Sequence, residues 1–84
     1  MTRDEILEKL LKIMSEEFEV ENPHLDDDLR EKHSFDSIDA ITLLELIEEM
    51  IDTQLTQEEK KSAMDIRTVN HICDYIEGLL KSRA

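Results

Sequence analysis

The sequence contains little glycine, proline or cysteine. Its 84 residues include one of each and no tryptophan, whereas 39% of the residues are hydrophobic. That hydrophobic content, with so little glycine and proline, excludes an intrinsically disordered composition despite the high charge. The single cysteine, Cys73, cannot form a disulfide within the chain, which is compatible with a reducing cytoplasm.

Long hydrophobic runs are also missing. The longest unbroken apolar runs, such as Ile6-Leu7, are two residues long. A membrane-spanning helix needs about 20 predominantly apolar residues. The first residues lead into a charged, periodic segment rather than the apolar core of a signal peptide. We therefore expect a cytoplasmic protein that does not insert into membranes.

Basic residues are scarce. Lysine and arginine number 10 against 22 aspartates and glutamates, which gives a formal net charge of −12. Nucleic acid is thus not expected as a partner, because phosphate binding requires a basic surface. Proteins with basic surfaces are the expected partners, with faster encounter at low salt.

Apolar periodicity predicts the first helix, over residues 3–17. Thr2 and Glu5 have the spacing of a capping box. Apolar residues then recur along one face of a helix; they are Ile6, Leu7, Leu10, Leu11, Ile13, Met14 and Phe18. The periodicity fails over residues 19–36, where Asn22-Pro23 breaks the helix, so we expect a long loop anchored by scattered apolar residues.

Three further helices follow. A helix over residues 37–52 buries one broad face, which comprises Ala40, Leu43, Leu44, Leu46, Ile47, Met50 and Ile51. A capping box formed by Thr56 and Glu59 opens a short helix that ends near Met64. Thr68 opens the last helix, whose apolar face includes Cys73. The expected fold is therefore all-α: a single domain over residues 1–84, with three main helices and one short one.

The stretch Asp36-Ser37-Ile38-Asp39 lies where the polar loop gives way to the second main helix. Unpaired N–H groups and the positive end of the helix dipole favour a phosphate beside a serine at such a junction. The simpler interpretation is that Asp36 or Ser37 only caps the helix, because both are standard N-cap residues.

The chain resembles an acyl carrier protein over nearly its full length. The resemblance comprises the order of the helices, the small size, the acidity and short motifs. These motifs are Asp36-Ser37-Ile38-Asp39, Ile51-Asp52-Thr53 with Leu55, Thr68-Val69 and Asp74-Tyr75-Ile76. The resemblance implies a carrier rather than an enzyme. By this resemblance, 4′-phosphopantetheine from coenzyme A is attached to Ser37, and this arm holds an acyl group as a thioester.

The resemblance also implies partners. They are a phosphopantetheinyl transferase and acyl-loading and acyl-processing enzymes with basic docking surfaces, which would meet the chain as a monomer. The residues expected to face them are Asp36, Ile38, Asp39, Thr42, Glu45, Glu48 and Glu49. Ile38, Thr42, Glu45 and Glu49 form one stripe on the predicted helix. The alternative is a solvated acidic face that contains one isoleucine.

The chain departs from the family pattern at three places. Ser34 stands where the family often has glycine. Thr42 and Glu45 stand where members of fatty-acid synthesis often have an acid and a methionine. The segment between Glu59 and Thr68 is about three residues longer than usual. These differences suggest a specialised carrier for fatty-acid, polyketide or related synthesis.

Other functions remain open or are disfavoured. An aminoacyl or peptidyl carrier would use the same serine, and an acidic helical adaptor would need no prosthetic group. Hydrolysis by Ser37 is disfavoured because no Gly-x-Ser-x-Gly turn surrounds it. We expect no specific metal site, since residues 24–28 lack the glycine and closing glutamate of a calcium loop. Cys73 is expected to be a buried packing residue.

Overall fold

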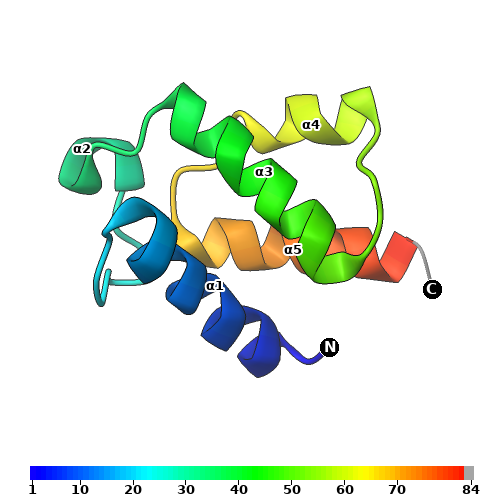
Figure 1. Ribbon diagram of the computed structural model, residues 1–84, viewed down its shortest axis with the longest axis horizontal. Coiled ribbons are helices and arrows are strands. Elements are labelled where there is room, and N and C mark those ends of the chain that lie inside the picture. Colours follow the sequence, from blue (N-terminus) through cyan, green and yellow to red (C-terminus); the bar gives the residue numbers. More distant parts are fainter. Residues whose placement is uncertain (83–84) are drawn as a thin grey trace.

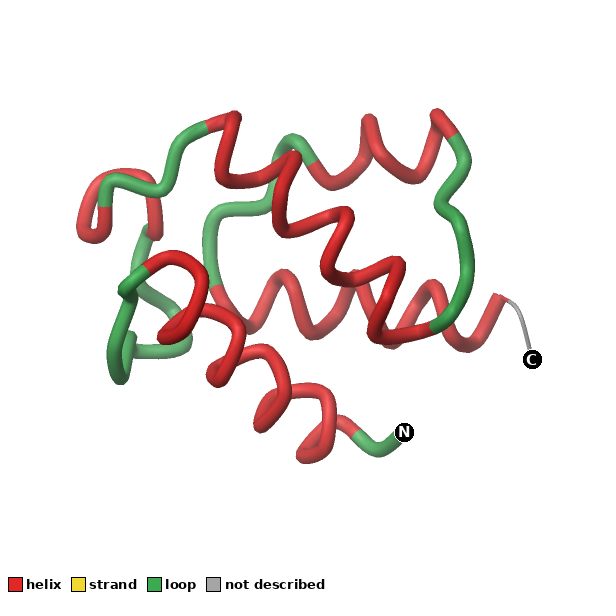
Figure 2. Tube along the Cα trace, in the orientation of Figure 1, coloured by secondary structure: helices red, strands yellow, loops and turns green. Residues whose placement is uncertain are grey.

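The computed structural model describes residues 1–82, which form five helices joined by loops (Figure 1). The helices are α1 (Arg3–Phe18), α2 (Leu29–His33), α3 (Ser37–Ile51), α4 (Gln57–Ala63) and α5 (Val69–Ser82). Helix and loop account for all of the described residues, and none of these residues lies in a strand (Figure 2). The prediction of an all-α fold is confirmed.

Helices α1 and α5 lie against each other, and α3 crosses the molecule diagonally with α4 beside it (Figure 1). Their apolar faces meet in one hydrophobic cluster that takes residues from all five helices. Ile6, Leu10 and Met14 are fully buried on α1, one turn apart, as the periodicity predicts. The radius of gyration is 11.8 Å, in line with the roughly 12 Å of a compact domain of this length.

The predicted helix starts are confirmed. The Thr2 and Thr56 side chains each accept a hydrogen bond from the backbone N–H three residues later, and Glu5 and Glu59 complete the two capping boxes. At the start of α5, the Thr68 hydroxyl accepts a hydrogen bond from the N–H of His71 at 3.1 Å. These contacts satisfy N–H groups that have no partner within the helices.

The predicted end of the first helix, at residue 17, is confirmed to within one residue, but Asn22-Pro23 is not what ends it. Helix α1 ends at Phe18 because Glu19 adopts a left-handed conformation with φ of 57° and its N–H bonds to the Met14 carbonyl. The expectation of a long loop over residues 19–36 was wrong. The segment contains a helix, α2, whose five residues are too few to show an apolar period. Its start is fixed by Asp28, whose carboxylate accepts hydrogen bonds from the N–H groups of Arg30 and Glu31.

The rest of this segment is held against the start of α5. The N–H of Leu29 bonds to the Arg67 carbonyl at 2.8 Å, and the N–H of Asn70 bonds to the Leu25 carbonyl at 3.0 Å. The Asn70 side chain also donates to the Asp26 carboxylate at 2.7 Å. The segment is therefore an anchored structure that fixes the path of the chain toward α3.

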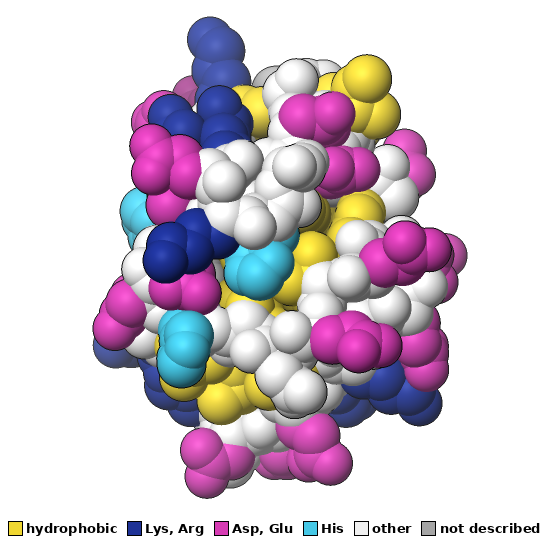
Figure 3. Space-filling view, turned by 90° about the vertical axis from the view of Figure 1, so that its left-hand side faces the viewer, with side chains coloured by type: hydrophobic (Ala, Val, Ile, Leu, Met, Phe, Trp, Pro, Cys, Tyr) yellow, Lys and Arg dark blue, Asp and Glu magenta, His cyan; other side chains and the backbone are white. Residues whose placement is uncertain are grey.

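The acidic side chains lie at the surface, since no charged residue among the described ones is buried. On the face shown in Figure 3, carboxylates are spread over much of the surface, histidine side chains lie toward the centre and left, and hydrophobic atoms are visible beside the central histidine. None of the helices in residues 1–82 combines the length and apolar character required to cross a membrane.

Candidate functional site

Three residues, Ser34, Phe35 and Asp36, connect α2 to Ser37 at the start of α3. Ser34 ends α2 in a left-handed conformation with φ of 53°. Phe35 is buried, its N–H bonds to the Leu29 carbonyl at 3.1 Å, and its ring meets that of Phe18 edge to face with the centroids 5.2 Å apart. This aromatic anchor fixes where α3 begins.

Asp36 and Asp39 form a capping box at the start of α3. The Asp36 carboxylate accepts a hydrogen bond from the N–H of Asp39 at 2.9 Å, and the Asp39 carboxylate accepts one from the N–H of Asp36 at 3.2 Å. Asp36 is thus the N-cap and Ser37 the first helical residue. Of the two residues that the simpler interpretation considered as caps, the structure assigns that role to Asp36.

Ser37 is exposed, and its hydroxyl forms no hydrogen bond within residues 1–82. The backbone N–H groups of Ser37 and Ile38 also have no partner there, as expected in the first turn of a helix. A phosphate bonded to the Ser37 oxygen would lie beside these donors and the positive pole of α3. The local geometry therefore fits a phosphodiester at this serine.

The predicted partner-facing residues share the outer side of α3. Six of the seven are on this helix, and Asp36 caps it. Ile38, Thr42, Glu45 and Glu49 are exposed, as is Asp36, whereas Asp39 and Glu48 are half-buried. The Ile38 side chain is 71% exposed.

Sequence reasoning missed a second isoleucine on this side, Ile41, which is 52% exposed. Its position could have been found from the helical pattern, because Ile41 falls outside the arc of the core residues and one turn from Ile38. The two isoleucines, with Glu45, give the outer side of α3 an apolar centre beside a carboxylate.

Glu48 has a structural contact that the sequence did not reveal. Its Oε2 accepts a hydrogen bond from the backbone N–H of Leu55 at 2.8 Å. Leu55 is buried, so this bond holds the connection between α3 and α4 against the core. Glu48 therefore has a structural role through its Oε2 atom, in addition to any contact that it makes with a partner.

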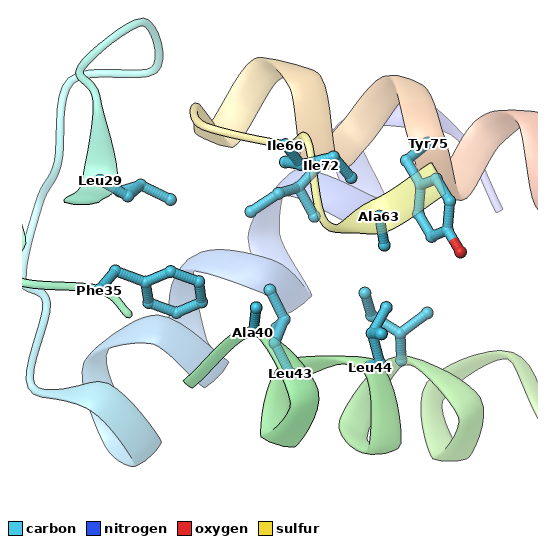
Figure 4. Close-up of a pocket in the computed structure, with 10 residues that line it drawn as sticks. Leu29, Phe35, Ala40, Leu43, Leu44, Ala63, Ile66, Ile72 and Tyr75 are labelled. Carbon is cyan, nitrogen blue, oxygen red and sulfur yellow. The ribbon is translucent and has the colours of Figure 1, made fainter. Parts of the chain in front are cut away.

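A small cavity lies beneath the start of α3 (Figure 4). Phe35 and Tyr75 approach it from opposite ends, and aliphatic side chains of α3 and α5 lie between them. Its free volume is about 20 Å³, close to the volume one water-sized probe needs. The Tyr75 hydroxyl donates to the Glu59 carbonyl at 2.6 Å, which links α5 to α4 beside the cavity. An acyl chain would fit here only if these side chains moved.

The remaining candidates have local structural contacts. Asp26 accepts a hydrogen bond from the Asn70 side chain, and Asp28 accepts one from the Arg30 N–H at the start of α2. Residues 1–82 contain no group of three or more acidic, histidine or cysteine side chains placed to hold a metal ion. Cys73 is buried as predicted, and this burial raises the pKa of its thiol. His33 Nε2 lies 3.9 Å from the Asp27 carboxylate.

Comparison with known proteins gives a consistent result. Residues 8–76 match the family model described as the phosphopantetheine attachment site. The chain is 34% identical over 82 residues to "Acyl carrier protein 2" of Ralstonia nicotianae, a match that covers 95% of this chain and 98% of the relative. No solved structure matches significantly. The chain belongs to the acyl carrier protein family, whose members are carriers rather than enzymes and hold 4′-phosphopantetheine covalently.

Proposed function

We propose that Ser37 is the residue to which 4′-phosphopantetheine is attached, and that the arm carries an acyl group as a thioester. The observation that supports this most directly is the exposed Ser37 hydroxyl, free of hydrogen bonds in the described chain, at the first position of α3. Asp36 and Asp39 fix that position through their capping box. The arm supplies the reactive thiol, and the chain holds and presents it.

The other serines have less suitable surroundings. Ser15 is half-buried within α1, and Ser34 ends α2 in a left-handed conformation. Ser62 is exposed but lies in the last turn of α4, away from the N–H groups at the start of that helix. Of these, none combines exposure with the start of a helix.

The outer side of α3 is the proposed docking surface for partner enzymes. We infer that Ile38 makes the apolar contact and that Asp36, Asp39, Thr42, Glu45, Glu48 and Glu49 surround it with polar and acidic groups. The partners would be a phosphopantetheinyl transferase and cytoplasmic acyl-loading and acyl-processing enzymes of fatty-acid, polyketide or related synthesis. Their basic groups would complement the carboxylates and speed encounter at low salt.

An aminoacyl or peptidyl carrier is the second candidate, since it would use the same serine and the same arm. The name of the relative favours an acyl group. Analysis of the intact protein from its native host by mass spectrometry separates the two, because the mass of the bound group distinguishes an acyl from an aminoacyl or peptidyl cargo.

The attachment site is tested by incubating the chain with a phosphopantetheinyl transferase and coenzyme A. Intact mass should show one arm on the wild type and on Ser34→Ala, a matched control three residues away, and no arm on Ser37→Ala. An arm on Ser37→Ala, or one that maps to Ser15, Ser62 or Ser82, would overturn the assignment. A wild type that stays unmodified would support an adaptor without a prosthetic group.

A further inference from the structure

A surface groove runs between α3 and α4. It is lined by Ile41, Leu44, Glu45, Glu48, Lys60 and Met64, and its volume is about 120 Å³. An engineered apolar cavity of about 150 Å³ admits a benzene molecule, so the groove has room for one apolar side chain. Leu44 is buried, whereas Ile41 is 52% exposed at the edge of the groove.

The groove lies close to Ser37. Ile41 follows Ser37 by four residues on α3, which places it about 6 Å further along the axis and on the same side of the helix. An enzyme whose active site encloses the Ser37 hydroxyl would therefore approach Ile41 as well. The groove is a place close to Ser37 where such an enzyme can bury an apolar side chain against this chain.

The charges at the groove are mixed. The Glu48 carboxylate accepts a hydrogen bond from the Leu55 N–H at 2.8 Å, which holds the side chain in place but leaves its negative charge at the groove. Glu45 is exposed and Lys60 is half-buried, and neither forms an ion pair within residues 1–82. The groove therefore carries two carboxylates on α3 and one ammonium group on α4, in a chain of net charge −12.

We propose that the groove receives an apolar side chain of the phosphopantetheinyl transferase, and that this enzyme presents an acidic group to Lys60 as well as a basic group to Glu45. The proposal rests on Ser37 being the attachment site and adds a requirement to it. A uniformly basic surface would satisfy the acids of α3 but would meet Lys60 with a like charge. The repulsion between Lys60 and a basic group would disfavour binding of enzymes whose surface is basic throughout.

The charge requirement is tested with Lys60→Glu against Lys61→Glu. Both substitutions make the same charge change in the last turn of α4, but Lys61 is exposed and does not line the groove. The measurement is kcat/KM for modification of Ser37 by a phosphopantetheinyl transferase with coenzyme A at low salt. We expect Lys60→Glu to lower kcat/KM about fivefold, Lys61→Glu to stay within about twofold, and the gap to narrow as salt rises.

The apolar contact is tested with Ile41→Ala. Because Ile41 is exposed, this variant should remain helical with a melting temperature near that of the wild type, and its kcat/KM should also fall. An unchanged kcat/KM for Ile41→Ala would show that the groove receives no apolar side chain.

The outcomes separate this proposal from the proposed function. If all variants acquire the arm but Lys60→Glu and Lys61→Glu react equally, or if Lys60→Glu reacts faster than the wild type, the partner surface is uniformly basic and the proposal fails alone. If the wild type acquires no arm, the attachment site fails and the proposal fails with it.

Discussion

Asp36 and Asp39 each accept a hydrogen bond from the other's backbone N–H, at 2.9 and 3.2 Å, so the two acids that flank Ser37 also fix the start of α3. Their presence beside Ser37, the proposed attachment residue, therefore has two explanations, which are capping and contact with a partner. Substitutions that retain one property and remove the other can separate them.

The first prediction compares Asp36→Ala with Asp36→Asn. Loss of an N-cap costs about 1 kcal/mol, so Asp36→Ala should melt lower by about 4–8 °C. Asn caps a helix as well as Asp does and carries no charge, so Asp36→Asn should melt near the wild type. If Asp36 also contacts the transferase, Asp36→Asn should be modified more slowly despite its stability. A wild-type rate for Asp36→Asn would leave capping as its only role.

The second prediction concerns the link between α1 and α5. Arg3 Nη1 forms ion pairs with Asp74, at 2.6 Å, and with Glu77, and these contacts raise the pKa of the guanidinium above its ordinary value. Arg3→Met should lower the melting temperature more than Lys12→Met, which removes an exposed charge from the same helix. The difference should shrink at high salt because the pairs are partly exposed. Equal melting temperatures would show that the pairs add nothing to stability.

The sequence was sufficient to predict the four longer helices because each has a local signal. Thr2, Thr56 and Thr68 mark helix starts by their caps, and the apolar period of α1 and α3 identifies the faces that are buried in the structure. Such signals depend on residues three or four positions apart, which a helix brings together regardless of the rest of the fold.

What the sequence did not reveal depends on contacts between distant residues or on very short elements. Arg3 meets Asp74 across 71 positions, and Glu48 reaches the N–H of Leu55. Helix α2 has five residues and one buried apolar side chain, Leu29, so it shows no period. The position of Ser37 followed from its motif, whereas the groove at Ile41 required the packing of α4 against α3.

The third prediction concerns Cys73. Burial raises the pKa of its thiol, so the folded chain retains the proton to higher pH than the unfolded chain does. As the pH rises past the ordinary thiol pKa, the unfolded state loses its proton first, and the free energy of unfolding should fall. Cys73→Ala should show a weaker decline over the same alkaline range. A disulfide reagent should also label the native chain much more slowly than the chain in denaturant; equal labelling rates would contradict the burial.

The fourth prediction concerns salt. A net charge of −12 favours expansion of the chain through self-repulsion. Moderate salt or divalent cations should therefore raise the melting temperature with little change in helical content, and a gain of about 1 kcal/mol would appear as about 4–8 °C. Asp26 and Asp28 already have hydrogen-bond donors, so the effect should come mainly from acids without partners. A flat or falling melting temperature would show that self-repulsion is insignificant.

The last prediction tests the docking surface on α3. Glu45→Lys with Glu49→Lys should remain helical and melt near the wild type, because both side chains are exposed. Modification of Ser37 should be much slower at low salt, and the deficit should narrow as salt rises, since rim charges act mainly on the association rate.

The control for this pair must avoid Asp74 and Glu77. These two acids lie on the polar face of α5, but they bind Arg3, so reversing them would also weaken the contact between α5 and α1. Glu8→Lys with Glu16→Lys makes the same charge change on exposed positions of α1. If both pairs slow modification equally, only net charge matters, and the outer side of α3 is an ordinary solvated face. If neither pair slows it, the transferase contacts another surface, and the segment just before Ser37 becomes the next to be tested.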